Sequence, residues 1–384
     1  MFSESDHHFM ARALELARRG LNTTNPNPRV GCVIVRDGVT LGEGWHQKLG
    51  GPHAEVEAIA DAKAKGHELR GATAYVTLEP CSHFGRTPPC ADALVREKIA
   101  KVVAAMEDPN PLVNGQGFEK LRAVGMEVRC GLFEREAREL NPGFVSRVTR
   151  GRPWVRLKTG MTLDAKVALQ NGQSQWITSQ AAREDGHLWR ARACIMLTGI
   201  GTVRDDDPLL NVRLTPEQLA ATIVSNPLRQ PLRVVLDSAF EINPLSRIFQ
   251  SGPVLIVCAT EPDPSKVAML KDKGGEVIVI AGAEKNGRPK TDLQLVMTML
   301  AERGFSEVHV EAGSKLNGSL LAAGLVDELL MYVAPSLIGA GQSFADLPQV
   351  QTLSDRHEFD FVSVDRIGPD VRLIARRSDS FLKA

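Results

Sequence analysis

The sequence predicts an α/β protein with two domains, each built on a sheet covered by helices. Short apolar runs rich in Val and Ile alternate with segments of helical period along both halves of the chain, which is the pattern of a layered α/β fold. This alternation is interrupted by "RVTRGRP" at 147–153, whose Arg, Gly and Pro content is typical of a linker. A length of 384 residues suits two or three domains. We therefore expect domains over residues 1–147 and 148–384.

The helices and strands expected in the first half follow from the spacing of apolar residues and from the positions of turn residues. Asp37-Gly38 separates two β-branched runs and predicts a hairpin turn. Segments with apolar residues three and four apart predict helices between the later strands. The expected order is helix 9–19, strands 29–35 and 41–46, helix 54–65, strand 72–78, a helix from about 91, strand 101–107, helix 118–124, strand 126–131 and a helix through 139.

The second half repeats the alternation and has enough strands for a sheet of its own. Its apolar runs, such as "LRVVLD" and "PVLIVCA", are short and continuous, as expected of strands buried on both faces. The expected strands are 154–163, 194–200, 232–237, 253–259, 276–280, 307–313 and 327–335, and the expected helices are 180–193, 292–303 and a short one after 313.

Composition and charge exclude several classes of protein. The 46 basic and 46 acidic residues cancel, and no long run of either sign occurs, so extended nucleic-acid binding is disfavoured. The N-terminus lacks the pattern of a signal peptide, and no apolar stretch is long enough to cross a bilayer. We expect a cytoplasmic enzyme that acts on small molecules, without a nucleic-acid or membrane partner.

The six cysteines are too few for a disulfide framework in a chain of this length. Cys81 and Cys90 are close in sequence and suggest metal binding. The other four, Cys32, Cys130, Cys194 and Cys258, lie in apolar strand-like runs and are interpreted as small buried hydrophobic residues.

The stretch "GPHAEVEAIA" places His53 and Glu55 two residues apart where a helix is expected to begin. Residues two apart on a regular helix point to nearly opposite sides, so both reach one centre only if His53 lies at the irregular start. "TLEPCSHFGRTPPC" adds Cys81 and Cys90 downstream. A catalytic zinc typically has three protein ligands and a water whose pKa falls to about 7. Cys90 also opens a helix, whose dipole favours a thiolate.

Zinc deaminases carry H-x-E followed by P-C-x-x-C, with the glutamate as proton carrier. Here the second cysteine follows nine positions after the first instead of three. Two alternatives remain: unligated cysteines, or a structural zinc with His83 as fourth ligand, which would leave Glu55 no activated water. Glu79 is a second candidate acid/base, but its place before Pro80 at a strand end favours a structural role in capping the loop.

The second half gives a weaker signal. "VEAGSKLNGS" predicts a strand ending near Gly313 and a turn into a helix, where backbone N–H groups bind phosphate. It is not a Walker A loop, because Ser319 stands where the lysine would be. No G-x-G-x-x-G opens an early strand-to-helix turn, and "TGIGT" alone indicates little.

Several motifs together resemble one family. "NPNPRVGCVIV", "GPHAE" and "CSHFGRTPPC" in the first half, and "KTGMTLDAKVA", "SQWITS", "TGIGTVRDDDPLLNVR" and "VEAGSKLNGSLL" in the second, are similar to the bifunctional riboflavin-biosynthesis deaminase-reductases. The resemblance covers nearly the whole chain. It implies a cytidine-deaminase-like α/β/α sandwich followed by a dihydrofolate-reductase-like α/β domain, with zinc and NADPH as cofactors and a homo-oligomer formed through the reductase domain.

For the first half, the resemblance implies zinc ligands at His53, Cys81 and Cys90 and a proton shuttle at Glu55. It also implies substrate contacts, with Arg86 standing where relatives often have lysine. These contacts are Asn25, His46, His83 and Arg86. Taken alone, His46 and His83 could each be a solvated polar residue.

For the second half, the resemblance implies catalytic roles for Lys158 and Asp206. Cofactor contacts are implied at Gly160, Trp176, Thr202, Asp206, Ser238 and the Gly313 to Ser319 loop, which comprises Gly313, Ser314, Lys315, Leu316, Asn317, Gly318 and Ser319. Substrate contacts are implied at Lys158, Ser174, Arg190, Leu210, Arg213 and Glu311. A sugar phosphate needs cationic donors such as Arg190 and Arg213, although a surface location for Arg190 in mid-helix is a serious alternative.

The activity implied is deamination of a ribosylamino-pyrimidine phosphate, followed by reduction of its ribosyl group to ribityl. Two rival functions are a base deaminase acting on RNA and a structural-zinc protein with an unrelated reductase activity. RNA binding would need aromatic stacking platforms, but the chain has four Trp and two Tyr. One departure from the family is Ala165 in "TLDAKVA", where relatives commonly have glycine and where alanine narrows the backbone options.

Overall fold

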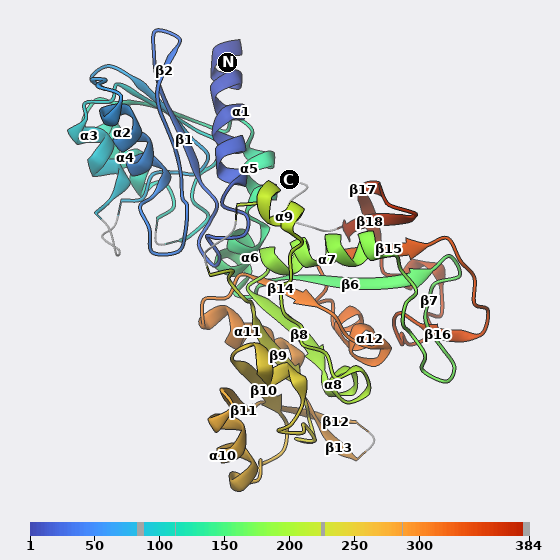
Figure 1. Cartoon of the computed structure of the whole chain (residues 1–384). Helices are drawn as coiled ribbons and strands as arrows, with labels where there is room; N and C mark the ends of the chain where they lie inside the picture. Colours follow the sequence, from blue (N-terminus) through green and yellow to red (C-terminus); the bar gives the residue numbers. More distant parts are fainter. Residues whose placement is uncertain (83–87, 112, 224–226, 286, 379–384) are drawn as a thin grey trace. The chain divides into compact units, whose positions relative to one another are not determined.

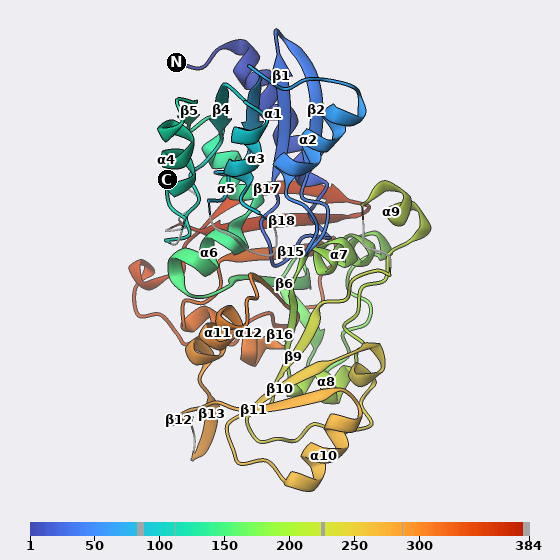
Figure 2. The ribbon, with the colours of Figure 1, turned by 90° about the vertical axis from the view of Figure 1, so that its left-hand side faces the viewer.

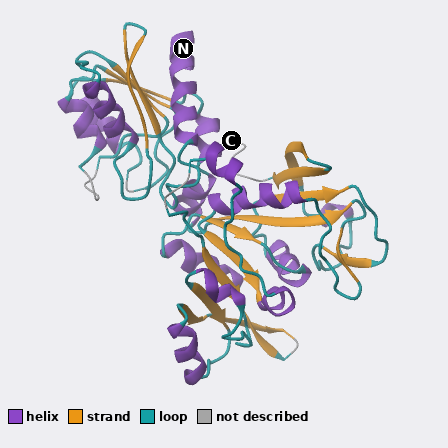
Figure 3. Ribbon diagram, viewed as in Figure 1, coloured by secondary structure: helices purple, strands orange, loops and turns teal. Residues whose placement is uncertain are grey.

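The structure is a computed structural model that describes residues 1–384 except 83–87, 112, 224–226, 286 and 379–384 (Figure 1). The chain divides into two compact units. Met1–Gly151 makes up most of the first, and Arg152–Gln218 with Leu228–Ser380 makes up the second. Each unit has a sheet with helices against it (Figure 3), so the predicted α/β class is confirmed.

The first unit has a five-stranded sheet in the order β2-β1-β3-β4-β5. The hairpin β1–β2 turns at Asp37 and Gly38, both with positive φ, as the Asp-Gly pair predicts. β1 is antiparallel to β3, whereas β3, β4 and β5 are parallel. The strands are β1 (Gly31–Arg36), β2 (Val39–Trp45), β3 (Thr73–Val76), β4 (Lys101–Ala104) and β5 (Glu127–Cys130).

Helices cover both faces of this sheet because successive strand side chains alternate between the faces. Helices α2, α3 and α4 lie on one side of this sheet, and α1 and α5 lie on the other (Figure 1). Cys32 and Ile34 pack with α2, α3 and α4, while Val33 and Val35 pack with α1, α5 and α6. Cys130 differs from the prediction of burial: it is exposed, because it ends the edge strand β5. The helices are α1 (Glu4–Arg18), α2 (Ala54–Ala64), α3 (Cys90–Arg96), α4 (Gln116–Ala123), α5 (Glu134–Leu140) and α6 (Pro142–Arg150).

The segment predicted as a linker over 147–153 is in part helical. α6 continues to Arg150, and Gly151 ends it in the left-handed conformation, with φ 66°. Pro142 favours the helix start, and Phe144 and Val145 are buried against the sheet of the first unit. Helix formation through residue 150 therefore rests on packing, which the Arg, Gly and Pro content does not reveal.

The second unit has a nine-stranded sheet in the order β11-β10-β9-β8-β14-β6-β15-β18-β17, seen from another side in Figure 2. The first seven strands are parallel, and the hairpin β17–β18 adds two antiparallel strands. This hairpin was not among the predicted strands, because β17 is largely exposed and has no continuous apolar run. The strands are β6 (Trp154–Thr162), β8 (Ile195–Gly199), β9 (Leu232–Leu236), β10 (Val254–Cys258), β11 (Gly275–Val279), β14 (Glu307–Val310), β15 (Glu328–Ala334), β17 (Phe359–Ile367) and β18 (Asp370–Arg377).

Helices and two small sheets complete this unit. The small sheets pair β12 with β13 and β16 with β7. The helices are α7 (Gln180–Arg192), α8 (Ile200–Asp206), α10 (Pro264–Asp272), α11 (Leu293–Glu302) and α12 (Ser314–Ala322), and α9 (Pro216–Ala221) begins in the unit. The remaining elements are β7 (Lys166–Leu169), β12 (Ala281–Lys285), β13 (Arg288–Thr291), β16 (Gly341–Ser343) and the short 3₁₀ turns η1 (Arg247–Ser251) and η2 (Leu353–Asp355).

Ala165 occupies the turn between β6 and β7 with φ 58°, a conformation that costs an L-residue about 1–2 kcal/mol. We expect Ala165→Gly to raise the free energy of unfolding by roughly 0.5–1 kcal/mol, since part of the gain is offset by the flexibility of glycine in the unfolded chain. Thermal or urea unfolding measures the change. Gly172→Ala, at φ 90° with open space around the added methyl, is the reciprocal control and should destabilise. Equal or lower stability of Ala165→Gly would show that the turn is unstrained.

Candidate functional site

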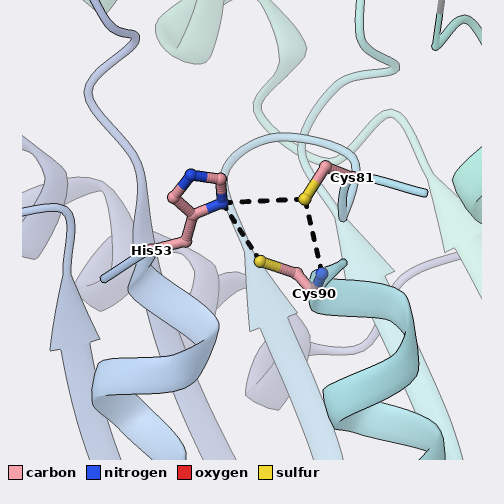
Figure 4. A group of neighbouring side chains, drawn as sticks. All are labelled: His53, Cys81 and Cys90. Carbon is pink, nitrogen blue, oxygen red and sulfur yellow. Dashed lines mark hydrogen bonds between the residues drawn. The ribbon is translucent and has the colours of Figure 1, made fainter. Parts of the chain in front are cut away.

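Three side chains of the first unit meet at the starts of α2 and α3 (Figure 4). His53 is the N-cap of α2, in an extended conformation just outside the helix, as the spacing of His53 and Glu55 required. Cys90 is the first residue of α3, and Cys81 lies in the segment after β3. His53 Nδ1 lies 3.2 Å from Cys90 Sγ and 3.6 Å from Cys81 Sγ, and the Cys90 backbone N–H donates to Cys81 Sγ at 3.3 Å.

The three ligand atoms fit a zinc ion. All lie within 4.8 Å of one another, and zinc bound tetrahedrally at about 2.0–2.3 Å holds such atoms about 3.5 Å apart. Hydrogen bonds from Cys90 and His53 lower the pKa of Cys81, which favours the thiolate that a metal needs. Within the described part of the chain, no other such group of three His, Cys, Asp or Glu side chains is found. His83, the alternative fourth ligand, and Arg86 lie outside the described residues.

Glu55 lies in the first turn of α2, beside the metal-binding group, and is only 3% exposed. Burial and then the neighbouring Cys81 raise the pKa of its carboxyl to about 7. A buried carboxyl at this place can hold or release a proton next to a reacting group. The structure thus brings Glu55 together with the three predicted ligands.

Glu79 has a different environment, which agrees with its interpretation as a structural residue. Its buried carboxylate accepts hydrogen bonds from the backbone N–H groups of Asp108, Gly115, Gly117 and Phe118, at 2.8–3.3 Å. These bonds cap the start of α4 and hold the loop before it. Gly117 is required there, because a Cβ would lie 2.0 Å from the Pro80 carbonyl oxygen.

We expect Glu79→Gln to destabilise the protein by about 2–4 kcal/mol, because the amide NH₂ would face backbone N–H groups left without an acceptor. Thermal unfolding with saturating zinc measures the loss. Asp92→Asn is the control: its ion pair with Lys120 is partly exposed, and the change should cost less than about 1 kcal/mol. A Glu79→Gln protein as stable as the Asp92→Asn protein would contradict the capping role.

Asn25 and His46, two predicted substrate contacts, are both buried. His46 Nδ1 lies 2.9 Å from the Pro52 carbonyl oxygen, and Nε2 lies 3.2 Å from Asn27 Nδ2. The imidazole packs edge-on against His53, with ring centroids 5.6 Å apart. His46 is therefore bonded within the protein and supports the backbone that precedes the ligand His53, which differs from the solvated residue that its sequence context alone suggested.

The second unit contains an open cleft of about 3370 Å³. It includes the residues that follow the carboxyl ends of the parallel strands β8, β9 and β14, the usual place for a ligand in such a sheet. Most predicted contacts of this half line it: Lys158, Gly160, Ser174, Trp176, Arg190, Thr202, Asp206, Leu210, Arg213, Ser238, Glu311, Gly313, Ser314, Lys315, Leu316 and Ser319.

Asn317 and Gly318 are not among the lining residues. Asn317 is buried and donates to the carbonyl oxygens of Ala312 and Phe344, at 3.1 and 2.8 Å. An added Cβ on Gly318 would lie 2.0 Å from the Asp346 carbonyl oxygen. The two residues hold the segment in place from behind, and the predicted Gly313 to Ser319 loop is in fact mostly the first turns of α12.

The start of α12 fits a phosphate-bearing cofactor. Gly313 is its N-cap and provides no side-chain cap, so the first N–H groups of the helix have no such partner there. A Cβ on Gly313 would meet nothing within 4 Å, which leaves the backbone open to the cleft. Uncapped N–H groups and the helix dipole together favour a bound phosphate.

Lys158, Arg190 and Glu311 form one cluster of opposite charges in the cleft. Arg190 pairs with both Glu311 oxygens at 2.6 and 2.8 Å, and Lys158 Nζ lies 3.9 Å from Glu311 Oε2. Against the effect of burial, Arg190 and Lys158 hold the pKa of Glu311 well below its usual value. The Arg190 side chain is 15% exposed, so the alternative of a surface arginine is wrong.

A further residue of the cleft was not predicted from the sequence. His187 lines the cleft on α7, one turn before Arg190. The i, i+3 spacing places the side chains of His187 and Arg190 on one face of the helix. This spacing is the signal in the sequence that could have identified His187.

The fold and the two sites define a zinc-dependent deaminase joined to a nucleotide-dependent reductase. Residues 3–106 match the cytidine and deoxycytidylate deaminase zinc-binding region, and residues 153–373 match the RibD C-terminal domain. The chain belongs to the RibD family of bifunctional deaminase-reductases in riboflavin biosynthesis, which use zinc and NADPH.

Relatives of known name support this membership over nearly the full length. The riboflavin biosynthesis protein RibD of Escherichia coli is 46% identical, covering 96% of this chain and 98% of that protein. The structure of Acinetobacter baumannii RibD, form 1, superposes with a TM-score of 0.87 at 39% identity, covering 98% and 99% of the two chains. The Thermotoga maritima deaminase/reductase gives a TM-score of 0.82 at 35% identity, covering 97% and 99%. The two predicted fold types are thereby confirmed.

Proposed function

We propose that the first unit hydrolyses the amino group of a diamino-hydroxy-phosphoribosylamino-pyrimidine to give the aminouracil, and that the second reduces the ribosyl group of that product to ribityl. The name printed for the Thermotoga maritima relative includes both a diaminohydroxyphosphoribosylaminopyrimidine deaminase and a 5-amino-6-(5-phosphoribosylamino)uracil reductase. The observation that carries the proposal is the convergence of His53, Cys81 and Cys90 beside the buried Glu55.

In the deaminase unit, His53, Cys81 and Cys90 would hold zinc. Zinc, when bound, supplies a Lewis acid that makes water a nucleophile at neutral pH. Glu55 takes a proton from the water that attacks the amino-bearing ring carbon and returns it to the departing ammonia. Asn25, His46, His83 and Arg86 are proposed to orient the substrate.

In the reductase unit, the N–H groups at the start of α12 would bind a cofactor phosphate. NADPH, when bound, supplies the hydride for the ribose carbon attached to the amine, in its open-chain imine form. Arg190 and Arg213 are donors suited to the sugar phosphate, and Glu311 fixes the Arg190 guanidinium. Lys158 and Asp206 are the proposed catalytic residues; both line the cleft.

Incubation with the diamino substrate tests the whole proposal. Ammonia release should not need NADPH, whereas NADPH oxidation should need the deaminated product. A base deaminase acting on RNA would release ammonia from RNA instead. A structural-zinc protein would release none.

We further propose that the domains 1–147 and 148–384 are chemically independent. A truncated protein of residues 148–384 should fold, bind NADPH and reduce the deaminated substrate without zinc, because every strand of the nine-stranded sheet is retained. Cooperative thermal unfolding and NADPH oxidation measure this. A folded but inactive fragment would contradict it, as would loss of reduction after zinc is chelated from the whole protein.

The remaining proposals concern assembly and location. We propose a homo-oligomer through the reductase unit, because the edge strand β17 exposes Phe361, Val362 and Val364, and sedimentation would detect it.

None of the helices in the described residues is both long and apolar enough to cross a membrane. We propose a cytoplasmic enzyme without a nucleic-acid partner, which cell fractionation and RNA-binding measurements would check.

A further inference from the structure

The segment 210–213, between α8 and α9, brings two proposed substrate contacts to the cleft. Leu210 and Val212 are buried, whereas Arg213 is exposed. The segment belongs to no strand or helix, and Leu210 has a positive φ of 46°. Its backbone must therefore be held by other groups, since buried N–H and C=O groups need partners.

On one side of the segment, Gln230 takes the place of a neighbouring strand. The Val212 N–H donates to Gln230 Oε1 at 2.7 Å, and Gln230 Nε2 donates to the Val212 carbonyl oxygen at 3.2 Å. One side-chain amide thus pairs with both backbone groups of a buried residue, as a peptide group in a sheet would.

On the other side, two residues of α7 hold the segment. The Arg213 N–H donates to His187 Nδ1 at 3.2 Å, and Arg190 donates to the Asn211 carbonyl oxygen at 3.0 Å. The same Arg190 guanidinium pairs with Glu311. Arg190 therefore connects the 210–213 segment to the end of β14.

The bond to Arg213 also fixes the proton on His187. Because Nδ1 accepts, a neutral imidazole carries its proton on Nε2, from which no bond to any residue within the described ranges is found. Burial, then Arg190 and Arg213, lower the pKa of His187 to about 3. The acceptor at Nδ1 is thus kept throughout the neutral range.

We propose that His187 and Gln230 are positioning residues for the reduction: they clamp the 210–213 segment so that Leu210 and Arg213 face the substrate. The inference rests on the proposed function, because it takes the sugar-phosphate substrate as what Arg213 meets. The clamp acts through the backbone, so its loss should weaken substrate binding and leave NADPH binding intact.

Gln230→Ala tests the clamp from the side opposite α7. Val212 would lose both partners, and we expect the KM for the deaminated substrate to rise about tenfold, with the KM for NADPH changed less than about twofold. Gln230→Glu keeps the acceptor but not the donor and should raise the substrate KM by a smaller factor; it also serves if Gln230→Ala does not fold. Unchanged substrate KM in a folded Gln230→Glu protein and in Gln230→Ala would overturn the clamp.

A pair of His187 variants separates positioning from direct contact. In His187→Asn, the amide oxygen can replace Nδ1, so the bond to Arg213 is kept and the Nε2–H is lost; substrate KM should stay within about threefold. His187→Leu removes both groups and should raise substrate KM about tenfold. An equal rise of the substrate KM in both variants would overturn the proposal, because it would show that the His187 Nε2–H contacts the substrate.

Asn317→Ala provides the matched control. The Asn317 side chain also donates hydrogen bonds to backbone carbonyl oxygens, but behind the start of α12. Removal of this side chain should therefore raise the KM for NADPH and not the KM for the substrate. A rise of the substrate KM alone in the Gln230 variants, together with a rise of the NADPH KM alone in Asn317→Ala, supports the clamp. An equal rise of both KM values in the Gln230 variants would overturn it. If the wild-type protein fails to reduce the deaminated compound, the proposed function fails instead.

Discussion

Glu55→Gln is expected to lower kcat for deamination about a hundredfold or more, with zinc content and reductase activity unchanged. Glutamine keeps the shape of the side chain in its buried place but cannot carry the proton between water and ammonia. Ammonia release under saturating substrate measures the loss. Zinc analysis of the same sample confirms that the metal is retained.

Glu57→Gln is the matched control for this prediction. It makes the same charge change two residues further along α2, and we expect near wild-type deamination. If Glu55→Gln deaminates at the rate of Glu57→Gln, another group carries the proton. Glu79 is then a poor candidate, because both of its carboxylate oxygens accept backbone hydrogen bonds.

Cys81→Ser should abolish zinc binding and deamination together while NADPH binding and reduction persist. A serine hydroxyl is not ionised at neutral pH and replaces a thiolate poorly as a zinc ligand. Metal analysis and ammonia release measure the effect. Cys130→Ser, which changes an exposed cysteine at the end of β5, should leave both unchanged. Full zinc content in the Cys81→Ser protein would contradict the assigned ligand set.

Much of the architecture could be predicted because its signals are local. β1, β8, β9 and β10 are buried on both faces, so their sequences are short continuous apolar runs that periodicity identifies. α6 could not be separated from a linker, because its evidence is the packing of Phe144 and Val145. β17 has mostly exposed side chains, and its pairing with β18 is a property of the sheet edge.

By itself, the sequence determined the chemistry of the metal centre. His53 and Glu55 lie in one motif, Cys81 and Cys90 lie in a second one, and the residue types of both motifs restrict the reactions available to them. The reductase cleft was different. Only the tertiary structure showed that Lys158 of β6 and Arg190 of α7 form ion pairs with Glu311 at the end of β14. It also showed that His187 and Gln230 hold the 210–213 segment. The physical reason is that these interactions join residues of different elements and loops, where neither a shared motif nor helical or strand periodicity relates one partner to the other.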